Sequence, residues 1–524
     1  MWKWWLHHKR SLRSPADQGM SAYEAASDPE ALSPIPADLQ TARRQVEAVF
    51  SDCEDVVLLE WRYGPGLANK AFSVYFHTLV QTKELNYMKA SLQDLVTHEV
   101  GPGTTVTPEE LISFFEHQGV SSQSAHLVDH FQTAVSKVMN GNIVIFFDGW
   151  DKALAYYAND TMGRQITEPI TEPVVQGPHM SFVEDLVKNI GLLRGLLKTP
   201  RLKMEMFTVG KVAQRDVAFG YLEGIVRPSV LAEFKSRIAG IGPEEITETS
   251  FLEDWIGESM YTPFPQVRYT ERPDSVVSSL LAGKIVVLMS GTPTTLICPC
   301  NFFEFFSSSE DFYHRTIYSS VIRILRMIAF SMAFMLPSTY IALSTFHSEL
   351  LPTVLLLTIL DTREGIPFPA FLEALLMEFF FEVLREAGIR MPRPIGSAVS
   401  IVGALVIGQA AIQAKIASPV MVIVVALTGI ASFALPQYNL STAIRILRFP
   451  LMVLAATLGG LGIMIGFLLT LLHLTCMRSL GDPYLAPMAP LDFKKFREVF
   501  ILPPRYRLAR SVEKGGAADS EERE

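Results

Sequence analysis

The chain has 524 residues and a net charge of −9, because 54 acidic side chains outnumber 45 basic ones. A chain of this length is too long for one hydrophobic core, so we expect two or more domains. The acidic balance argues against nucleic acid as a partner. The four cysteines are scattered and "CPC" lacks the spacing of a zinc site, so we interpret them as buried or incidental thiols and predict no metal or cofactor.

The N-terminal residues 1–40 predict a flexible arm. They are rich in Ser, Pro and Ala and begin with the basic, aromatic sequence "MWKWWLHHKR". No apolar run follows this sequence, so it does not resemble a signal peptide. We therefore expect the soluble region behind it to stay on the cytoplasmic side of a membrane.

An internal repeat divides the soluble region that follows. "VSKVMNGNIVIFFDG" at 135–149 and "VSSLLAGKIVVLMSG" at 277–291 are identical at six of 15 positions. Each predicts the end of a helix, a glycine turn, a buried strand and a second glycine. The alternative is a chance likeness between two unrelated helix–strand units. We interpret the match as a duplication and predict two related α/β subdomains, at 41–163 and 164–296.

The segment between the repeats predicts an amphipathic helix but no catalytic site. In "SFVEDLVKNIGLLRGLLKT", residues 181–199, apolar side chains recur near one helix face. The soluble region has no glycine-rich phosphate loop, no Ser/His/Asp pattern and no HExxH sequence. We therefore do not expect an enzyme.

The second half of the chain is dominated by long uncharged runs. Since about 20 apolar residues span the hydrocarbon core as a helix, each run is long enough to cross a membrane. The runs without Asp, Glu, Lys or Arg are 327–346, 395–414, 416–444 and 449–477. We predict an all-α polytopic membrane domain at 297–490, with spans near 322–346, 395–414, 416–437 and 450–474, followed by a basic and then disordered tail at 491–524.

A charged stretch interrupts these runs at residues 360–388. As a helix from 371 to 387, it places Glu378, Glu382 and Glu386 on one face, because residues four apart share a face. An ionised carboxylate at membrane depth costs about 2.5–3.5 kcal/mol or more, so this row needs water, cations or a pore. Three interpretations remain open: a solvated interfacial helix, an acidic vestibule at a channel mouth, and salt bridges to a neighbouring subunit or to the loop "RMPRP".

The sequence on either side of this helix suggests further membrane features. Gly365, Pro367 and Pro369 in "REGIPFP" predict a break or re-entrant turn, so 350–388 is either interfacial or re-entrant. In the next run, small residues such as Gly403 favour close helix packing. The same run is also a candidate pore wall, whose inward-facing residues are predicted to be Val399, Val402, Val406 and Gln413.

The charge of the tail constrains the topology. Seven Lys or Arg fall between 478 and 510, which favours the cytoplasmic side. The N-terminal region is expected on the same side. We therefore predict an even number of crossings, namely four spans plus the interfacial or re-entrant segment.

Several motifs of the chain resemble one known family. The segments "NFFEFFSSSEDFYHRTIYSSVIRILR", "REGIPFP", "LMEFFFEVLREAGIRMPRPIG", "AVSIVGALVIGQAA" and "GDPYLAPMAP" are similar to the A-subunit family of bacterial spore germinant receptors, the GerA type. In the soluble region, "ITEPVVQGP" and "FPQVRYTERPD" fit the same family. The resemblance covers about residues 41–490.

This resemblance implies a polytopic subunit of the inner spore membrane, surrounded by membrane lipid. Such subunits work with a permease-like B subunit that senses nutrient and a lipoprotein C subunit. They are thought to form a homo-oligomeric ring that conducts monovalent cations, so the implied function is a nutrient-gated channel that triggers germination. The alternative is a signalling scaffold that holds the permease-like sensor while ions flow elsewhere. A secondary transporter ranks below both, because "REGIPFP" has no matching interruption in a second half.

Overall fold

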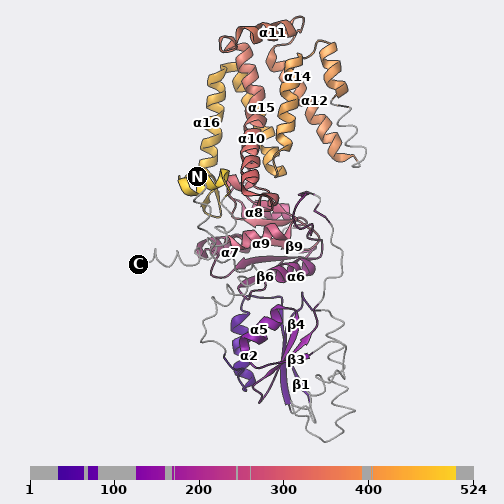
Figure 1. The fold of residues 1–524 in the computed structure, drawn as a ribbon, viewed down its shortest axis with the longest axis vertical. Coiled ribbons are helices and arrows are strands. Elements are labelled where there is room, and N and C mark those ends of the chain that lie inside the picture. The colour runs from indigo at the N-terminus through magenta and orange to yellow at the C-terminus, as the bar shows by residue number, and fades with distance from the viewer. Residues whose placement is uncertain are drawn as a thin grey trace, which may run out of the picture. The chain divides into compact units, whose positions relative to one another are not determined.

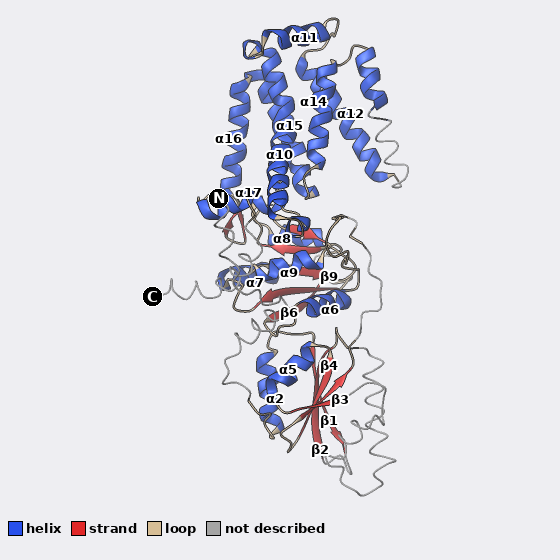
Figure 2. Ribbon diagram, viewed as in Figure 1, coloured by secondary structure: helices blue, strands red, loops and turns tan. Residues whose placement is uncertain are grey.

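The computed structural model describes residues 33–63, 69–80, 125–159, 168–169, 171–242, 246–259, 261–391, 403 and 405–502. Its helices and strands are labelled in Figure 1 and coloured by type in Figure 2. The chain divides into two compact units. The first contains Met1–Arg164 and Ile190–Met204, and the second contains Gln165–Asn189 and Glu205–Glu524.

The first unit is built on a five-stranded antiparallel sheet. Helices α2 (Leu39–Val49) and α5 (Phe131–Met139) share a buried core with this sheet, in which Val46 and Val138 pack with Phe72 and Phe146. All six residues of the central strand β4 are buried, as expected of a strand covered on both faces. In spatial order the strands are β1 (Val56–Tyr63), β2 (Asn69–Phe76), β4 (Asn142–Phe147), β5 (Ala153–Tyr157) and β3 (Ala125–Val128).

A buried ion pair stabilises the first unit. The helix predicted at 181–199 is shorter in the structure, where it forms α6 (Leu186–Leu196). Its Arg194 donates two hydrogen bonds of 2.8 Å to the Asp55 carboxylate and a third, of 2.6 Å, to the Leu202 carbonyl oxygen. Both charged side chains are fully buried. The pair therefore holds α6 to the start of β1.

A second five-stranded sheet, which belongs largely to the second unit, repeats the strand order of the first. Its helices are α7 (Pro228–Ala239), α8 (Thr249–Ile256) and α9 (Pro273–Leu281). In spatial order its strands are β6 (Leu202–Val209), β7 (Arg215–Leu222), β9 (Ile285–Met289), β10 (Thr295–Cys298) and β8 (Arg268–Thr270). Position for position, this order matches that of the first sheet.

The matching details confirm the predicted pair of related α/β subdomains. In each subdomain a nine-residue helix, α5 or α9, precedes the central strand. Phe147 pairs with Ala71 in the first sheet, and the equivalent Met289 pairs with Val217 in the second. The glycine between helix and strand, Gly141 or Gly283, has φ +79° in both, which favours glycine over any other residue. The predicted subdomain boundaries themselves stay predictions.

The second unit continues into a bundle of helices. α10 (Thr316–Thr345) and α15 (Tyr438–Leu458) are, by length and composition, the two described helices able to cross a membrane. Residues 405–413 are also helical. The other helices of the bundle are α11 (Thr353–Arg363), α12 (Ala370–Arg390), α14 (Pro419–Phe433) and α16 (Gly460–Cys476). Figure 1 shows α11 lying across one end of the bundle.

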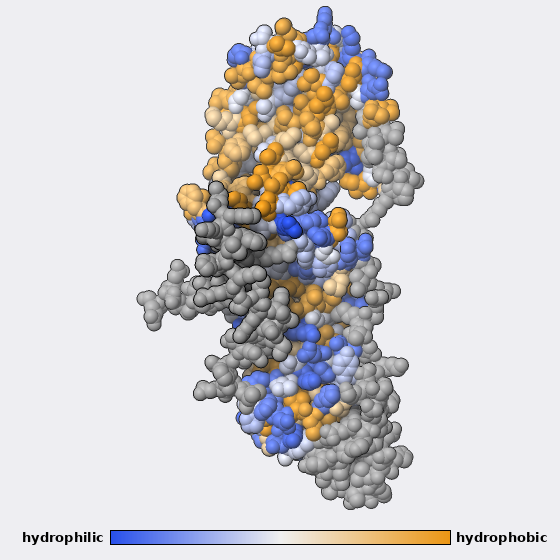
Figure 3. Space-filling view, viewed as in Figure 1, coloured by the Kyte–Doolittle hydropathy of each residue, from blue (hydrophilic) through white to orange (hydrophobic). Residues whose placement is uncertain are grey.

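The surface of the bundle is apolar. In Figure 3, hydrophobic side chains gather over the helices, whereas the visible parts of the sheets carry a mixture of polar and apolar groups. Large apolar side chains such as Val354, Ile423 and Leu472 are more than half exposed. A bundle that exposes this much apolar surface is suited to lipid rather than to water.

The chain enters and leaves the bundle beside the second sheet. α10 begins directly after the short 3-10 helices η3 (Phe302–Phe306) and η4 (Ser309–Phe312). At the other end, Ser479, just beyond α16, donates to the Gln266 carbonyl oxygen at 3.0 Å, and the Tyr484 hydroxyl donates to that of Pro265 at 2.7 Å. The chain therefore leaves the region of the second sheet and returns to it at the same end of the bundle, and the even number of crossings stays a prediction.

The helix bounds correct one prediction. The stretch predicted as a single span at 450–474 forms parts of two helices, because α15 ends at Leu458, α16 begins at Gly460, and Gly459 separates them. Gly459 has φ +62°, and a side chain there would lie within 2.9 Å of Phe346. The break therefore requires glycine both for its backbone conformation and for close packing. In addition, α15 starts at Tyr438, within the stretch predicted to connect two spans.

Candidate functional site: paired charges within the bundle

The predicted acidic helix exists and extends beyond its predicted bounds. α12 runs from Ala370 to Arg390 and carries Glu378, Glu382 and Glu386 at four-residue spacing. Exposure rises along this row: the side chain of Glu378 is 4% exposed, that of Glu382 42% and that of Glu386 56%. The row therefore passes from the packed interior of the bundle to its surface.

Glu378 forms a buried ion pair with Arg448 of α15. The Arg448 Nη1 atom donates to the Glu378 carboxylate at 2.6 Å, and both side chains are 4% exposed. The Nε atom of Arg448 donates to the carbonyl oxygen of Ala333 on α10, at 2.8 Å. These two contacts join α12, α15 and α10. Removing one partner of a buried pair costs about 3–5 kcal/mol, because the other charge is left without compensation.

This buried pair is not fully satisfied. Among the described residues, Oε1 of Glu378 and Nη2 of Arg448 have no hydrogen-bond partner. A bidentate arginine–carboxylate contact satisfies both carboxylate oxygens and restricts the geometry. The pair in the bundle satisfies only one, so it is held less rigidly than a bidentate pair.

A second pair lies one helical turn further along the row. The Arg445 Nη1 atom donates to Glu382 at 2.8 Å, and Arg385 of α12 also contacts this carboxylate. The Arg445 guanidinium lies 5.7 Å from the ring centroid of Tyr438, a distance typical of a cation–π contact. Glu386, near the end of α12, pairs with Arg390 at 2.7 Å on the exposed surface.

A second buried carboxylate, Glu373, holds the beginning of α12. Glu373 is fully buried and lies 3.1 Å from Arg363, the last residue of α11. It also accepts a hydrogen bond of 3.0 Å from the backbone N–H of Ser418, the residue that caps α14. Glu373 therefore links the ends of three helices, a role that the sequence pattern did not indicate.

The residues predicted to form a turn lie in the connection between α11 and α12. Gly365 has φ +81°, a backbone conformation that favours glycine. Pro369 immediately precedes the first residue of α12, where a missing N–H costs nothing. Pro367 lies between them. These residues separate α11 from α12, and the re-entrant turn stays a prediction.

The predicted pore-lining residues are only partly described. Val399 and Val402 lie outside the described residues. Val406 and Gln413 belong to the helical segment 405–413, and both are exposed in the single chain. They are therefore available to contact lipid, water or a neighbouring copy, and their place in a pore stays a prediction.

The two arginines of α15 were missed by the sequence interpretation. Arg445 and Arg448 occur in "RILR", between two uncharged runs, and were assigned to a connection between spans. The structure places both in a helix interior, where acidic residues of α12 compensate their charges. Their three-residue spacing, which puts them on one helix face, is the signal that predicts a shared partner helix.

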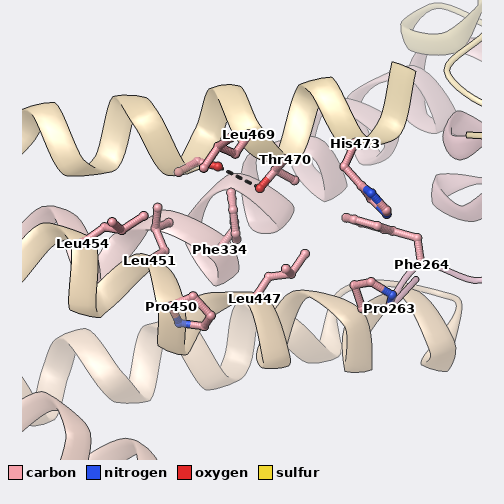
Figure 4. Close-up of a pocket in the computed structure, with 11 residues that line it drawn as sticks. Pro263, Phe264, Phe334, Leu447, Pro450, Leu451, Leu454, Leu469, Thr470 and His473 are labelled. Carbon is pink, nitrogen blue, oxygen red and sulfur yellow. Dashed lines mark hydrogen bonds between the residues drawn. The ribbon is translucent and has the colours of Figure 1, made fainter. Parts of the chain in front are cut away.

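A cavity of about 280 Å³ lies between α10, α15 and α16 (Figure 4). Its wall is largely apolar, with Phe334 from α10, Leu451 and Leu454 from α15, and Leu469 from α16. Of its polar lining groups, the Thr470 hydroxyl donates to the Gly466 carbonyl oxygen and the His473 ring contacts Thr262 at 2.8 Å. Polar nutrients need several convergent polar groups, which this cavity does not offer. Among the described residues, no cluster has the ligands of a metal site either.

Together, the two sheets, the apolar bundle and its internal ion pairs define a membrane-associated protein with a large soluble region. The family model for the Bacillus/Clostridium GerA spore germination protein matches residues 44–512. The chain therefore belongs to the GerA family of spore germination proteins.

Individual relatives align over most of the chain. The chain is 38% identical to the uncharacterized membrane protein YfkQ of Bacillus subtilis, over 91% of each chain. It is 39% identical to spore germination protein KA of the same organism, over 86% of this chain and 81% of that one. It is 37% identical to spore germination protein A1, over 84% of this chain and 89% of that one. The KA and A1 relatives are spore germination proteins, and the matching family is one of germination proteins rather than of known enzymes.

One solved structure is also similar. It is the N-terminal domain of the A subunit of the Bacillus megaterium spore germinant receptor GerK3, with 25% identity and a TM-score of 0.40, covering 52% of this chain and 99% of that one.

Proposed function

We propose that this chain is the membrane A subunit of a spore germinant receptor and that its copies form a ring that conducts cations when nutrient is sensed. The observation that carries the proposal is the GerA match over residues 44–512, which spans both sheets and the described bundle. The inner spore membrane follows from the same resemblance, whereas the cytoplasmic side of the sheets follows from the basic tail and the predicted even number of crossings. Protease protection in sealed vesicles tests the orientation, since a terminus digested from the opposite side contradicts it.

The proposed partners are a permease-like B subunit and a lipoprotein C subunit. The apolar cavity supports nutrient binding by a partner subunit rather than by this chain, because its wall lacks the convergent polar groups that a polar nutrient needs. Nutrient recognition is then placed in the permease-like partner, and this chain converts its occupancy into opening. Co-purification of the three subunits from one membrane extract tests the assembly.

We propose that the ion pairs between α12 and α15 keep the channel closed. Glu378–Arg448 and Glu382–Arg445 hold these helices together across the bundle. Every carboxylate of the row already has an arginine partner in this chain, and Glu378 is buried, so the proposed acidic vestibule is limited to the partly exposed Glu382 and Glu386. The exposed Val406 and Gln413 lie on a helix that is free to face the axis of a ring.

Planar-bilayer recording of the purified chain, with and without its partners, tests the channel. Val402→Ala is expected to raise the resting leak, because a smaller side chain weakens a hydrophobic constriction. Ile423→Ala, an exposed position on α14, is the matched control and is expected to leave the leak unchanged. Unchanged conductance across substitutions at Val399, Val402 and Val406 removes this helix from the pore.

The scaffold alternative is favoured by one observation. Every carboxylate of the α12 row already has an arginine partner within the same chain. A static bundle of this kind can hold a sensor without conducting ions. Under this alternative, the purified chain is silent in the bilayer at any concentration, and conductance appears only with other subunits.

A further inference from the structure

The short helix after the bundle has the character of a membrane-surface helix. α17 (Phe493–Phe500) carries Phe493, Phe496 and Phe500 on one face, with spacings of three and four residues. Lys494 and Lys495 lie on the opposite side and are exposed. Asp492 caps the helix by accepting hydrogen bonds from the backbone N–H groups of both lysines, at 3.0 and 3.1 Å. A defined helix therefore presents separate apolar and cationic faces.

The apolar face of α17 is only partly covered by the protein. Phe496 packs edge-on against Phe303, with ring centroids 5.9 Å apart. Phe493, however, is 77% exposed, and the flanking Leu491 and Ile501 are each more than half exposed. Three large apolar side chains thus lie uncovered beside a cluster of basic groups.

The contacts of α17 fix its depth relative to α10. The backbone N–H of Leu502 donates to the Ser320 hydroxyl at 3.1 Å, and Arg323 donates to the Glu498 carbonyl oxygen at 3.3 Å. α10 has 30 residues, or about 45 Å at 1.5 Å per residue, whereas the hydrocarbon core is about 30 Å thick. The excess length lies at the N-terminal end, where Arg323 and Arg326 pair with Asp311. α17 is therefore attached to the part of α10 that passes through the headgroup layer.

We propose that α17 lies in the headgroup layer of the membrane, with Phe493 inserted among the lipids and Lys494, Lys495 and Arg497 bound to anionic phospholipid headgroups. The uncovered apolar side chains and the adjacent positive charge complement such a surface on both counts. This contact fixes the end of the bundle at the membrane surface, next to the sheet that α10 and α16 both adjoin. The proposal does not depend on whether the chain conducts ions.

Lipid quenching of a single fluorescent label tests this position. The full-length chain, with Cys476→Ser to remove its exposed thiol, is labelled at Phe493→Cys or, as the matched control, at Lys495→Cys. Each is reconstituted into phosphatidylcholine vesicles containing phosphatidylglycerol and shallow brominated lipid. The label at position 493 is expected to be quenched at least about twofold more than the label at 495. Equal quenching at both positions, or none at 493, overturns the proposal.

The anionic part of the proposal has its own test. Reversing the three charges, as Lys494→Glu, Lys495→Glu and Arg497→Glu, is expected to abolish the difference in 493 quenching between vesicles with and without phosphatidylglycerol. Arg201→Glu, at an exposed position on the soluble region, is the control and is expected to preserve that difference. If the triple variant also preserves it, anionic headgroups are not the partner.

Discussion

Two buried arginine–carboxylate pairs, one in the soluble region and one in the bundle, are built differently. Arg194 meets Asp55 through two hydrogen bonds and uses a third donor on Leu202. Arg448 meets Glu378 through a single hydrogen bond, and each partner keeps one unpaired polar atom among the described residues. The first is a bidentate clamp. The second pair holds two helices together, but fewer hydrogen bonds are broken when it separates. Such a pair suits helices that change their arrangement.

The charge on the clamp is also fixed. Burial lowers the pKa of Arg194, but the attraction of Asp55 outweighs it and raises the pKa above its ordinary value. A cationic group with a raised pKa in the folded state adds stability that is fully present below its unfolded pKa. Since the ordinary pKa of arginine lies far above neutral pH, Arg194 keeps its charge and contributes this stability at neutral pH.

The largest expected effect follows from breaking the clamp. Arg194→Met leaves the buried Asp55 without a cation, so we expect the free energy of unfolding of the first unit to fall by about 3–5 kcal/mol. Unfolding followed through the fluorescence of Trp61 and Trp150, both in this unit, measures the loss. Lys188→Met, on the same helix but with a largely exposed ammonium group, is the control. A loss below that of the control contradicts the structural role of the clamp.

A smaller effect is expected in the bundle. Glu378→Gln removes the charge but keeps an oxygen that accepts from Arg448, and Arg448 keeps its bond to Ala333. We therefore expect a loss of about 1–3 kcal/mol, less than the roughly 3–5 kcal/mol for removing a partner entirely. Thermal unfolding of the chain in lipid nanodiscs provides the measurement. If Glu378→Gln lowers the stability as much as Arg194→Met does, the two pairs do not differ in strength as described.

The smallest effect is expected at the surface. Glu386→Gln breaks only the exposed pair with Arg390, which is worth at most about 0.5 kcal/mol. The same nanodisc measurement is expected to show no shift in the unfolding midpoint beyond its error. A clear destabilisation indicates that Glu386 has a further partner, as the neighbouring copy of a ring provides.

The repeat could be predicted from the sequence because its evidence is local. Within 15 residues, each copy contains the helix end, the glycine at φ +79° and the buried strand that the structure shows. The acidic row of α12 was predicted for the same reason. Helical spacing is visible in a single segment.

The partners of the row could not be predicted in this way. Glu378 and Arg448 are 70 residues apart, and each looks unfavourable when its own segment is judged for hydropathy. The charged residues were therefore interpreted as marking the ends of spans. For this reason the sequence did not predict that α15 begins at Tyr438. The cost of a buried charge depends on what it meets in the fold, and that information is not local.

Ion flux from vesicles containing charge-swapped variants tests the central claim most directly. The account predicts that Glu378→Arg alone and Arg448→Glu alone each raise the resting cation leak, because like charges then separate α12 from α15. Combining the two substitutions restores the pair and is expected to return the leak to the wild-type level. If folded single variants leak no more than wild type, or the double variant leaks as much as the singles, the pair does not hold a channel closed.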